Sequence, residues 1–305
     1  MPLNIRQLEI VRAISRYGSV TGAADALGVS QPAVSMMLRE ANQKAGFQLF
    51  ARKHGRLQPT AETAVIMADV DRLFDGMDRI NRLVLEMKDV NIGTVHIAAT
   101  PTLAENLLPR AIKQVQSARP NLQVIVDTMN NNDVAASVVE QQVDLGLILA
   151  PLGNVEAKTI ELCEVDLICV VNRHNPLAGR KSVTLKDLSP YPLISFSRNL
   201  PLGQLVEQCF QKAGMRRRIA CEVNQSSTAC ALVQAGIGVA IIDAFWLIGQ
   251  GDPELARLAL MPRMKVSAHA LVPKTAVLSR PARLMLQAIK VAARDLDLKP
   301  TSQHV

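Results

Sequence analysis

The sequence predicts an all-α N-terminal region, one long helix, and a C-terminal α/β domain built from two subdomains. Three observations predict this fold class. Two short helix patterns flank a tight turn near residue 28, apolar residues then recur at heptad spacing over residues 66–87, and strand patterns alternate with helix patterns from residue 95 onward. The chain has 305 residues, of which 49% are hydrophobic, so two or three domains with substantial cores are expected.

The N-terminal region has the pattern of three helices, with a tight turn between the second and the third. A first helix is expected over residues 5–16. Ser19 can cap the next helix, and Gly28 can end it because glycine readily adopts the left-handed conformation of a helix C-terminus. Ser30 can cap a third helix, and Pro32 is tolerated in its first turn, where no intrahelical N–H donor is needed. This is the outline of a helix-turn-helix.

The third helix has one polar face and one apolar face. Gln31, Ser35 and Arg39 repeat at intervals of four residues and point outward. The apolar face carries Val34, Leu38, Ala41 and Ala45. A helix-turn-helix places such a helix in the DNA major groove, with its N-terminal residues nearest the bases. An ordinary helical hairpin, whose polar face is merely solvated, is the alternative at this point.

The segment after this helix favours DNA binding. Apolar residues at 47–50 precede a basic, glycine-containing turn, as in the wing of a winged helix-turn-helix. The basic residues of this turn are Arg52, Lys53 and Arg56. Residues 1–60 contain eight basic and three acidic residues, whereas residues 61–89 contain four basic and seven acidic residues. The basic excess therefore lies in the expected DNA reader, as a phosphate-binding surface requires.

A long helix is expected after Thr60, which can cap it. Its apolar positions alternate steps of four and three over about three heptads, which is the pattern of a coiled-coil seam. These positions are Ile66, Val70, Leu73, Met77, Ile80, Val84 and Met87. Packing of the seam against its own domain is one interpretation. We favour a dimerisation helix, since a partner chain would cover the seam and hold two readers at a fixed spacing.

The remainder of the chain alternates strands and helices, which indicates a parallel sheet covered by helices. Strands are expected near residues 95–98, 122–126, 145–149, 167–171, 193–196, 220–223, 239–242 and 268–272. Helices are expected over residues 107–118, 134–141, 202–213, 228–235 and 281–295.

Ligands of open α/β sheets bind at the carboxyl ends of strands, near helix N-termini. Nine residues at such points are candidates: Thr100, Pro101, Thr102, Phe196, Ser197, Arg198, Ser226, Ser227 and Asp243. A simple helix-capping role is the alternative for each hydroxyl group. Arg198 beside Asp243 would suit a carboxylate and an ammonium group, and hence an amino-acid-like or opine-like small molecule.

The N-terminal motifs resemble those of LysR-type transcriptional regulators. The resemblance rests on Ala23-Ala24, on residues 30–35 and 46–52, and on Pro59-Thr60. It implies a dimerising linker helix, a C-terminal fold like type 2 periplasmic binding proteins, and an effector cleft lined by the loops named above. Two departures are visible. Ala41-Asn42 stands where many members have Leu-Glu, and Met36 stands where many have a polar or basic residue.

The resemblance also implies a division of the chain and of its DNA contacts. The expected parts are a winged helix-turn-helix DNA-binding domain (1–60), a linker and dimerisation helix (61–90), and an effector-binding regulatory domain (91–300). The regulatory domain would have one subdomain of residues 91–162 and 266–300, and another of residues 163–265. The expected DNA-binding residues are Thr21, Ser30, Gln31, Pro32, Ser35, Arg39, Arg52, Lys53 and Arg56. Gln31, Pro32, Ser35 and Arg39 would read bases, and Thr21 and the wing residues would hold phosphates.

The expected partners are double-stranded DNA, a small-molecule effector, and further copies of the chain as a homodimer and a dimer of dimers. RNA polymerase is a further candidate. No cofactor and no metal are expected, because the five histidines are scattered without ligand spacing. The sequence lacks an apolar run of about 20 residues, so no membrane span is expected. The N-terminus lacks signal-peptide features, so the cytoplasm is the expected location.

Three other functions were weighed from the same residues. Cys221 and Cys230 could form a redox couple, although Cys230 lies in an apolar helical run where a buried thiol is ordinary. A cytoplasmic solute-binding protein would share the α/β cleft, but the N-terminal motifs argue against it. An enzyme is not expected, because the sequence contains no nucleophile elbow, P-loop, dinucleotide-binding fingerprint or metal cluster.

Overall fold

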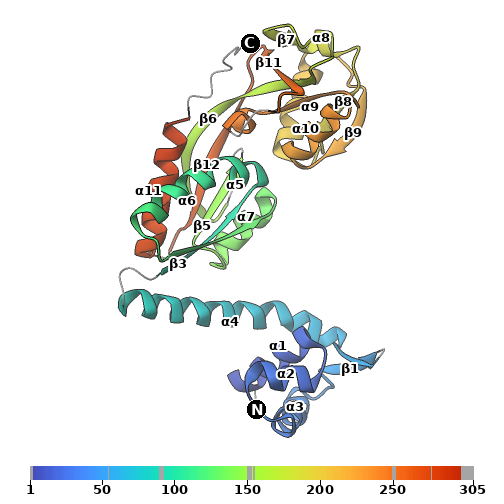
Figure 1. Ribbon diagram of the computed structural model, residues 1–305. Helices are drawn as coiled ribbons and strands as arrows, with labels where there is room; N and C mark the ends of the chain where they lie inside the picture. The colour runs from blue at the N-terminus through green and yellow to red at the C-terminus, as the bar shows by residue number, and fades with distance from the viewer. Residues whose placement is uncertain are drawn as a thin grey trace. The chain divides into compact units, whose positions relative to one another are not determined.

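The computed structural model describes residues 3–53, 55–88, 93–149, 153, 155–248, 252–275 and 277–296 (Figure 1). The chain forms two compact units, Met1–Val84 and Leu85–Val305. The first unit contains the helices and the hairpin of the N-terminal region, and the second contains the α/β domain. None of the helices in the described part of the chain is long and apolar enough to span a membrane.

Three helices form the first unit around a shared apolar core, and their bounds agree closely with the sequence-based prediction. The Ser19 hydroxyl accepts a hydrogen bond from the Gly22 N–H at 3.0 Å, which caps the second helix as predicted. Gly28 has a φ of 64°, in the left-handed region, and so ends that helix without the strain a Cβ would add. The helices are α1 (Ile5–Tyr17), α2 (Val20–Leu27) and α3 (Gln31–Ala45).

A two-stranded hairpin follows α3 and forms the predicted wing. Strands β1 (Phe50–Lys53) and β2 (Arg56–Pro59) pair antiparallel. The Leu57 N–H donates to the carbonyl of Gly18 at 2.8 Å, which fastens the hairpin to the end of α1. The hairpin is therefore anchored at its base to the three-helix core.

Helix α4 (Ala61–Lys88) begins at Thr60, whose hydroxyl accepts a hydrogen bond from the Thr63 N–H at 3.3 Å. The start of its apolar seam packs within the first unit: Ile66 contacts the apolar core, and Val70 is 5% exposed. Val70 is therefore buried and Ile66 partly buried within the chain itself, in agreement with the alternative interpretation for this end of the seam. Leu73, Met77, Ile80 and Val84 are exposed, while the side chain of Met87 lies outside the described residues.

Arg12 fastens α1 to α4. Its guanidinium pairs with Asp71 at 3.0 Å and with Asp75 at 3.2 Å, and it lies over the ring of Phe74. Two of the seven acidic residues in the 61–89 segment, Asp71 and Asp75, therefore bind α4 to α1.

The second unit begins with a sheet in the order β4-β3-β5-β12-β6. Its two faces carry different helices. On one face, Ala98, Ile148 and Leu271 pack with α7 in an apolar cluster. On the other face, Ile97 belongs to the larger core, which also contains residues of α6 and α11; these two helices lie side by side (Figure 1). The strands are β3 (Gly93–Ala99), β4 (Leu122–Thr128), β5 (Leu145–Leu149), β6 (Ala157–Asn172) and β12 (Lys265–Pro273); the helices are α5 (Pro101–Asn106), α6 (Leu108–Ala118), α7 (Asn131–Val139) and α11 (Arg280–Arg294).

The second sheet continues from β6 in the order β6-β10-β8-β9, and β11 pairs with both β6 and β7. Parallel pairing of β10, β8 and β9 agrees with the alternation of strands and helices in the sequence. The elements are β7 (Ser182–Thr184), α8 (Leu185–Leu188), β8 (Leu193–Phe196), α9 (Pro201–Lys212), β9 (Ile219–Val223), α10 (Ser226–Gln234), β10 (Val239–Asp243), the 3₁₀ helix η1 (Ala244–Ile248) and β11 (Leu255–Met261).

Two strand segments cross between the subdomains. Strand β6 pairs with β12 as far as Asp166 and with β10 and β11 from Leu167 onward. At the crossing the Leu167 N–H donates to the carbonyl of Met264 at 2.7 Å. The predicted change of subdomain after residue 162 is thus four residues early, because β6 stays in the first sheet for longer than its apolar run suggests.

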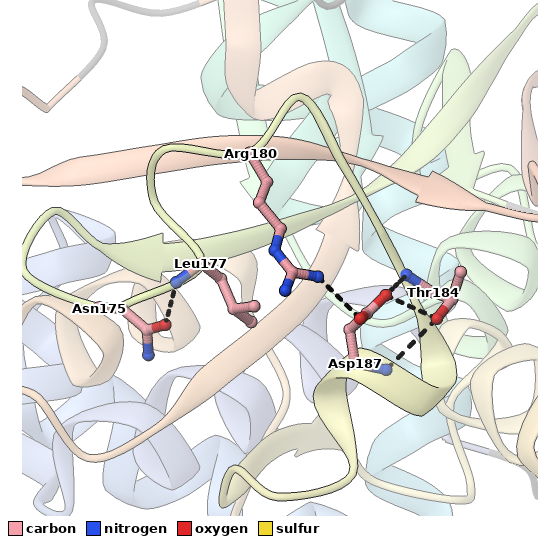
Figure 2. Close-up of polar contacts among 5 residues, drawn as sticks. All are labelled: Asn175, Leu177, Arg180, Thr184 and Asp187. Carbon is pink, nitrogen blue, oxygen red and sulfur yellow. Dashed lines mark hydrogen bonds and ion pairs between the residues drawn. The ribbon is translucent and has the colours of Figure 1, made fainter.

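The segment that contains β7 and α8 was missed by the sequence-based prediction. Side chains organise it: the Asp187 carboxylate accepts hydrogen bonds from the hydroxyl and N–H of Thr184, and from Arg180 at 2.7 Å (Figure 2). These donors lower the pKa of Asp187 to about 2. Upstream, the Asn175 side chain accepts from the Leu177 N–H. Because polar side chains rather than apolar periodicity define this segment, periodicity could not reveal it.

Candidate functional site

The first unit presents the predicted DNA-reading residues on its surface. Ser30, Gln31, Pro32 and Arg39 are exposed, and Ser35 is half-buried. Gln31 Nε2 donates to the Ser35 hydroxyl at 3.2 Å, so these two side chains orient one another. Ser30 occupies the N-cap position of α3 as predicted, but its side chain makes no capping hydrogen bond. Its hydroxyl is therefore available for other contacts.

The predicted phosphate-binding residues are exposed as well. Arg52, Lys53 and Arg56 lie on the hairpin, where Lys53 stands opposite Arg56 in the strand register. Thr21 is exposed in the first turn of α2. Neighbouring cations on a two-stranded hairpin form the kind of surface that binds a sugar–phosphate backbone.

One departure from the family pattern has a structural role that the sequence did not reveal. Ala41 is fully buried in the helical core. Asn42 accepts a hydrogen bond from the Leu49 N–H and donates one to Gln48 Oε1, both at 2.9 Å. Asn42 therefore ties α3 to the segment that leads into the hairpin, and the tightness of packing of this helix is preserved.

The second unit contains a cavity of about 690 Å³ between its two sheets. It lies at the carboxyl ends of β3, β4, β5, β8 and β10, as the rule for open α/β sheets predicts. Seven of the nine predicted residues line it: Thr100, Pro101, Thr102, Phe196, Ser197, Ser226 and Asp243.

Asp243 belongs to the lining of this cavity. The carboxylate is buried and accepts hydrogen bonds from the hydroxyls of Thr102 and Ser226, each at 2.9 Å. Burial raises its pKa, which the two hydroxyl donors oppose. Thr102 begins a helix of the first subdomain and Asp243 ends a strand of the second, so one of these bonds joins the two subdomains.

Thr100 differs from its neighbour Thr102. It is 8% exposed, and its Oγ1 has no hydrogen-bond partner among the described residues. A buried hydroxyl normally has a partner, because leaving it unpaired costs free energy. Since Thr100 lines the cavity, a bound molecule is the natural partner for this hydroxyl.

Arg198 and Ser227 do not line the cavity, which corrects their prediction. Arg198 Nε lies 3.4 Å from the Glu207 carboxylate, and its side chain is 70% exposed. Glu207 also pairs with the buried Arg217, which donates to the Ser195 hydroxyl at 2.8 Å. Glu207 therefore holds Arg198 on the outer surface of the second subdomain, so Arg198 and Asp243 do not form the predicted pair.

Other lining residues were missed by the sequence-based prediction. They end or follow β4, begin α7, end β5, lead into or begin α9, or follow β9, and are Thr128, Met129, Asn130, Asn131, Asp133, Leu149, Asn199, Leu200, Pro201, Leu202 and Asn224. The segment after β4 carries the signal used for its neighbours, since a strand ends there and Asn130 caps the next helix. The same rule could therefore have found it.

The charges around the cavity are all of one sign. Its lining includes two carboxylates, Asp133 and Asp243, and the described residues that line it include no lysine, arginine or histidine. Helices α5, α9 and α10 begin at the cavity without a side-chain capping hydrogen bond, so their first-turn N–H groups contribute positive potential there.

The cysteines do not support redox chemistry at this site. All five are free thiols, and burial raises the pKa of Cys230 to about 12. A thiol with so high a pKa carries almost no reactive thiolate near neutral pH. No cluster of residues suited to hold a metal ion occurs within the described ranges of the chain.

Two family models match the chain. The model described as "Bacterial regulatory helix-turn-helix protein, lysR family" matches residues 5–64, and the model described as "LysR substrate binding domain" matches residues 88–294. Among similar proteins, the HTH-type transcriptional regulator DgcR of Pseudoalteromonas sp is 30% identical over 91% of this chain and 95% of its own length. The transcriptional activator protein LysR of Escherichia coli (strain K12) is 28% identical over 94% of this chain and 91% of its own.

A third relative and two solved structures agree with these matches. The octopine catabolism/uptake operon regulatory protein OccR of Rhizobium meliloti is 31% identical over 79% of this chain and 80% of its own length. Full-length CbnR, a LysR family transcriptional regulator, has the same fold with a TM-score of 0.76 at 21% identity, covering 96% of this chain and 100% of that one. CbnR complexed with its target DNA gives a TM-score of 0.77 at 20% identity, covering 95% and 100%. The chain is a member of the LysR family of transcriptional regulators, with an N-terminal helix-turn-helix and a C-terminal effector-binding domain.

Proposed function

We propose that this regulator reads its operator through the outer face of α3 and holds the DNA backbone through its hairpin. The observation that carries this proposal is the pairing of an exposed polar helix face with an exposed basic hairpin on one small unit. Gln31, Pro32, Ser35 and Arg39 are assigned to base edges, and Ser30, whose hydroxyl makes no cap, is grouped with them. Thr21, Arg52, Lys53 and Arg56 are assigned to phosphates.

This division of roles is tested with Ser35→Ala and Arg52→Ala, whose binding is measured on operator DNA and on random DNA over a range of salt concentrations. Ser35→Ala should lose about 1–3 kcal/mol of discrimination between the two DNAs and little non-specific binding. Arg52→Ala should weaken binding to both DNAs and reduce the salt slope by about one. Equal losses on both DNAs for both variants would refute the assignment.

The working assembly is proposed to be a homodimer that pairs again into a dimer of dimers. Support comes from the four exposed apolar side chains of α4 at residues 73, 77, 80 and 84, whose steps of four, three and four form a coiled-coil seam. A dimer would hold two reading helices at the spacing of two half-sites. RNA polymerase is proposed as a further partner at the promoter, and the cytoplasm, where promoter DNA is found, as the place of action.

The effector is proposed to be an amino compound that also carries a carboxylate, such as an amino acid or an opine. Asp133 supplies a negative charge at the cavity wall, and the buried carboxyl group of Asp243 belongs to the same lining. The uncapped starts of α9 and α10, together with the unpaired Thr100 hydroxyl, replace Arg198 as the groups that receive the carboxylate. OccR, by its name, regulates an operon for an opine, which agrees with this class.

Matched ligands test this class directly. Calorimetry with pairs of amino acids or opines and their deaminated acids should give heat with amino compounds only. Asp133→Asn should weaken that binding about tenfold or more, since it removes the exposed charge that faces the amine. Binding of the deaminated acids with equal or greater affinity would contradict the proposal.

A further inference from the structure

The exposed side chain of Met36 lies on the outer face of α3. It is 58% exposed, although methionine is usually buried in cores. Its neighbour Met37 packs against the helical core of the same unit, whereas Met36 is not part of that cluster. Folding of the first unit therefore uses Met37 and leaves Met36 free to contact something else.

Helical geometry places Met36 on the side of α3 opposite its buried face. Val34 and Ala41 mark the buried side of the helix. At about 100° per residue, Met36 lies about 150° around the helix from both. Pro32 and Arg39, which are proposed to read bases, lie on the same outward line and are also exposed. A helix that enters a groove with Pro32 and Arg39 toward the bases carries Met36 between them.

The chemistry of a thioether limits what Met36 can recognise there. It offers no N–H or O–H donor and only a weak acceptor, so it cannot read the polar edge of a base. The apolar group that a base pair presents in the major groove is the C5-methyl of thymine. A flexible, polarisable side chain is well suited to pack against such a methyl group.

We propose that Met36 is a specificity-determining residue that reads a thymine methyl group in each half-site. The inference rests on the proposed binding of DNA by α3. A basic residue at this position would favour the O6 and N7 acceptors of guanine and would add to the salt dependence. Met36 instead contributes affinity that depends on thymine and is nearly independent of salt.

The test begins with selection of preferred sites from random DNA by the full-length protein. Each thymine of the selected site is then replaced by deoxyuridine, which removes the methyl group and leaves the base-pairing edge intact. One thymine in each half-site should respond, with about fourfold weaker binding per half-site and about fifteenfold for both, as expected for one buried methyl group at each. Thymines that contact no apolar side chain serve as internal controls.

Variants at position 36 complete the test. Met36→Ala should bind the thymine site about as weakly as the wild-type protein binds the uracil site, and it should respond little to the replacement. Met36→Leu, which keeps an apolar side chain, should retain the response. The melting temperature of both should match the wild type, because the side chain is exposed. Selected sites at which Met36→Ala keeps the full response to uracil would overturn the inference, whereas failure to select any site would contradict DNA reading by α3 altogether.

Discussion

Replacing Thr102 by valine removes one hydroxyl donor from the buried carboxylate of Asp243 and preserves the shape of the side chain. The lost bond is 2.9 Å long and joins the two subdomains. A hydrogen bond to a charged group contributes about 1.5–3 kcal/mol. For a domain of this size, about 2 kcal/mol corresponds to a fall of about 4–8 °C in the melting temperature. Thr102→Val should therefore melt several degrees earlier than the wild type.

Thr100→Val is the matched control, because it removes a buried hydroxyl two residues away that has no partner among the described residues. Removing an unpaired buried hydroxyl does not break a bond and relieves a desolvation cost. The melting temperature of Thr100→Val should be unchanged or higher, while its affinity for the effector should fall. Scanning calorimetry of the full-length variants measures the first quantity, and titration calorimetry the second.

The pH dependence of Thr102→Val provides a further check. Burial raises the pKa of Asp243 in the folded state, so ionised Asp243 destabilises the fold increasingly as the pH rises through that pKa. Loss of the Thr102 donor raises this pKa further. The extra destabilisation should therefore be absent below the ordinary carboxyl pKa of 3.8 and fully developed only above the raised pKa of Asp243. Equal melting temperatures of the two valine variants at pH 8 would refute the contribution assigned to the Thr102–Asp243 bond.

Three other outcomes are expected. Ile80→Asp should weaken dimerisation by about 3 kcal/mol or more, because each chain of the dimer loses one apolar side chain from the interface. Sedimentation should then show monomers. Val65→Asp is the control: Val65 is exposed but lies off the seam, so the dimer should stay intact. Stability to urea should fall as the pH drops below about 6.5, because burial lowers the pKa of His269 and the unfolded chain then binds more protons than the folded chain. His269→Phe should make stability depend less on pH in this range. An unchanged pH dependence would exclude His269 as its source. Arg12→Met should destabilise the first unit by about 1–2 kcal/mol through loss of two partly exposed ion pairs and the contact with Phe74, and unchanged denaturant midpoints would contradict this.

Local rules predicted the helix ends and most of the cavity correctly. Ser19, Gly28 and Thr60 act through their immediate neighbours, so a cap or a left-handed turn is visible in a few residues. The position of the cavity follows from the parallel order of the strands. That order brings Thr100 and Ser226 to one cavity although they are far apart in the chain.

Predictions that depended on what covers a residue were less successful. A heptad pattern identifies one face of α4 but not its neighbour at each turn: Ile66 packs against the helical core, and Val70 is buried. Arg198 follows a strand like the true lining residues, yet Glu207 of α9 holds it outside the cavity. Such choices depend on side chains from distant segments, and no periodicity in the sequence encodes them.

The most direct test of the account is a footprint of the full-length protein on the DNA upstream of its own gene, with and without a panel of amino compounds. The account predicts a long protected region that covers two sites and changes in length with one amino compound. Protection should persist in Asp133→Asn but no longer respond to that compound. Absence of protection at any salt concentration, together with absence of binding to random DNA, would contradict the assignment of α3 and the hairpin as the DNA reader.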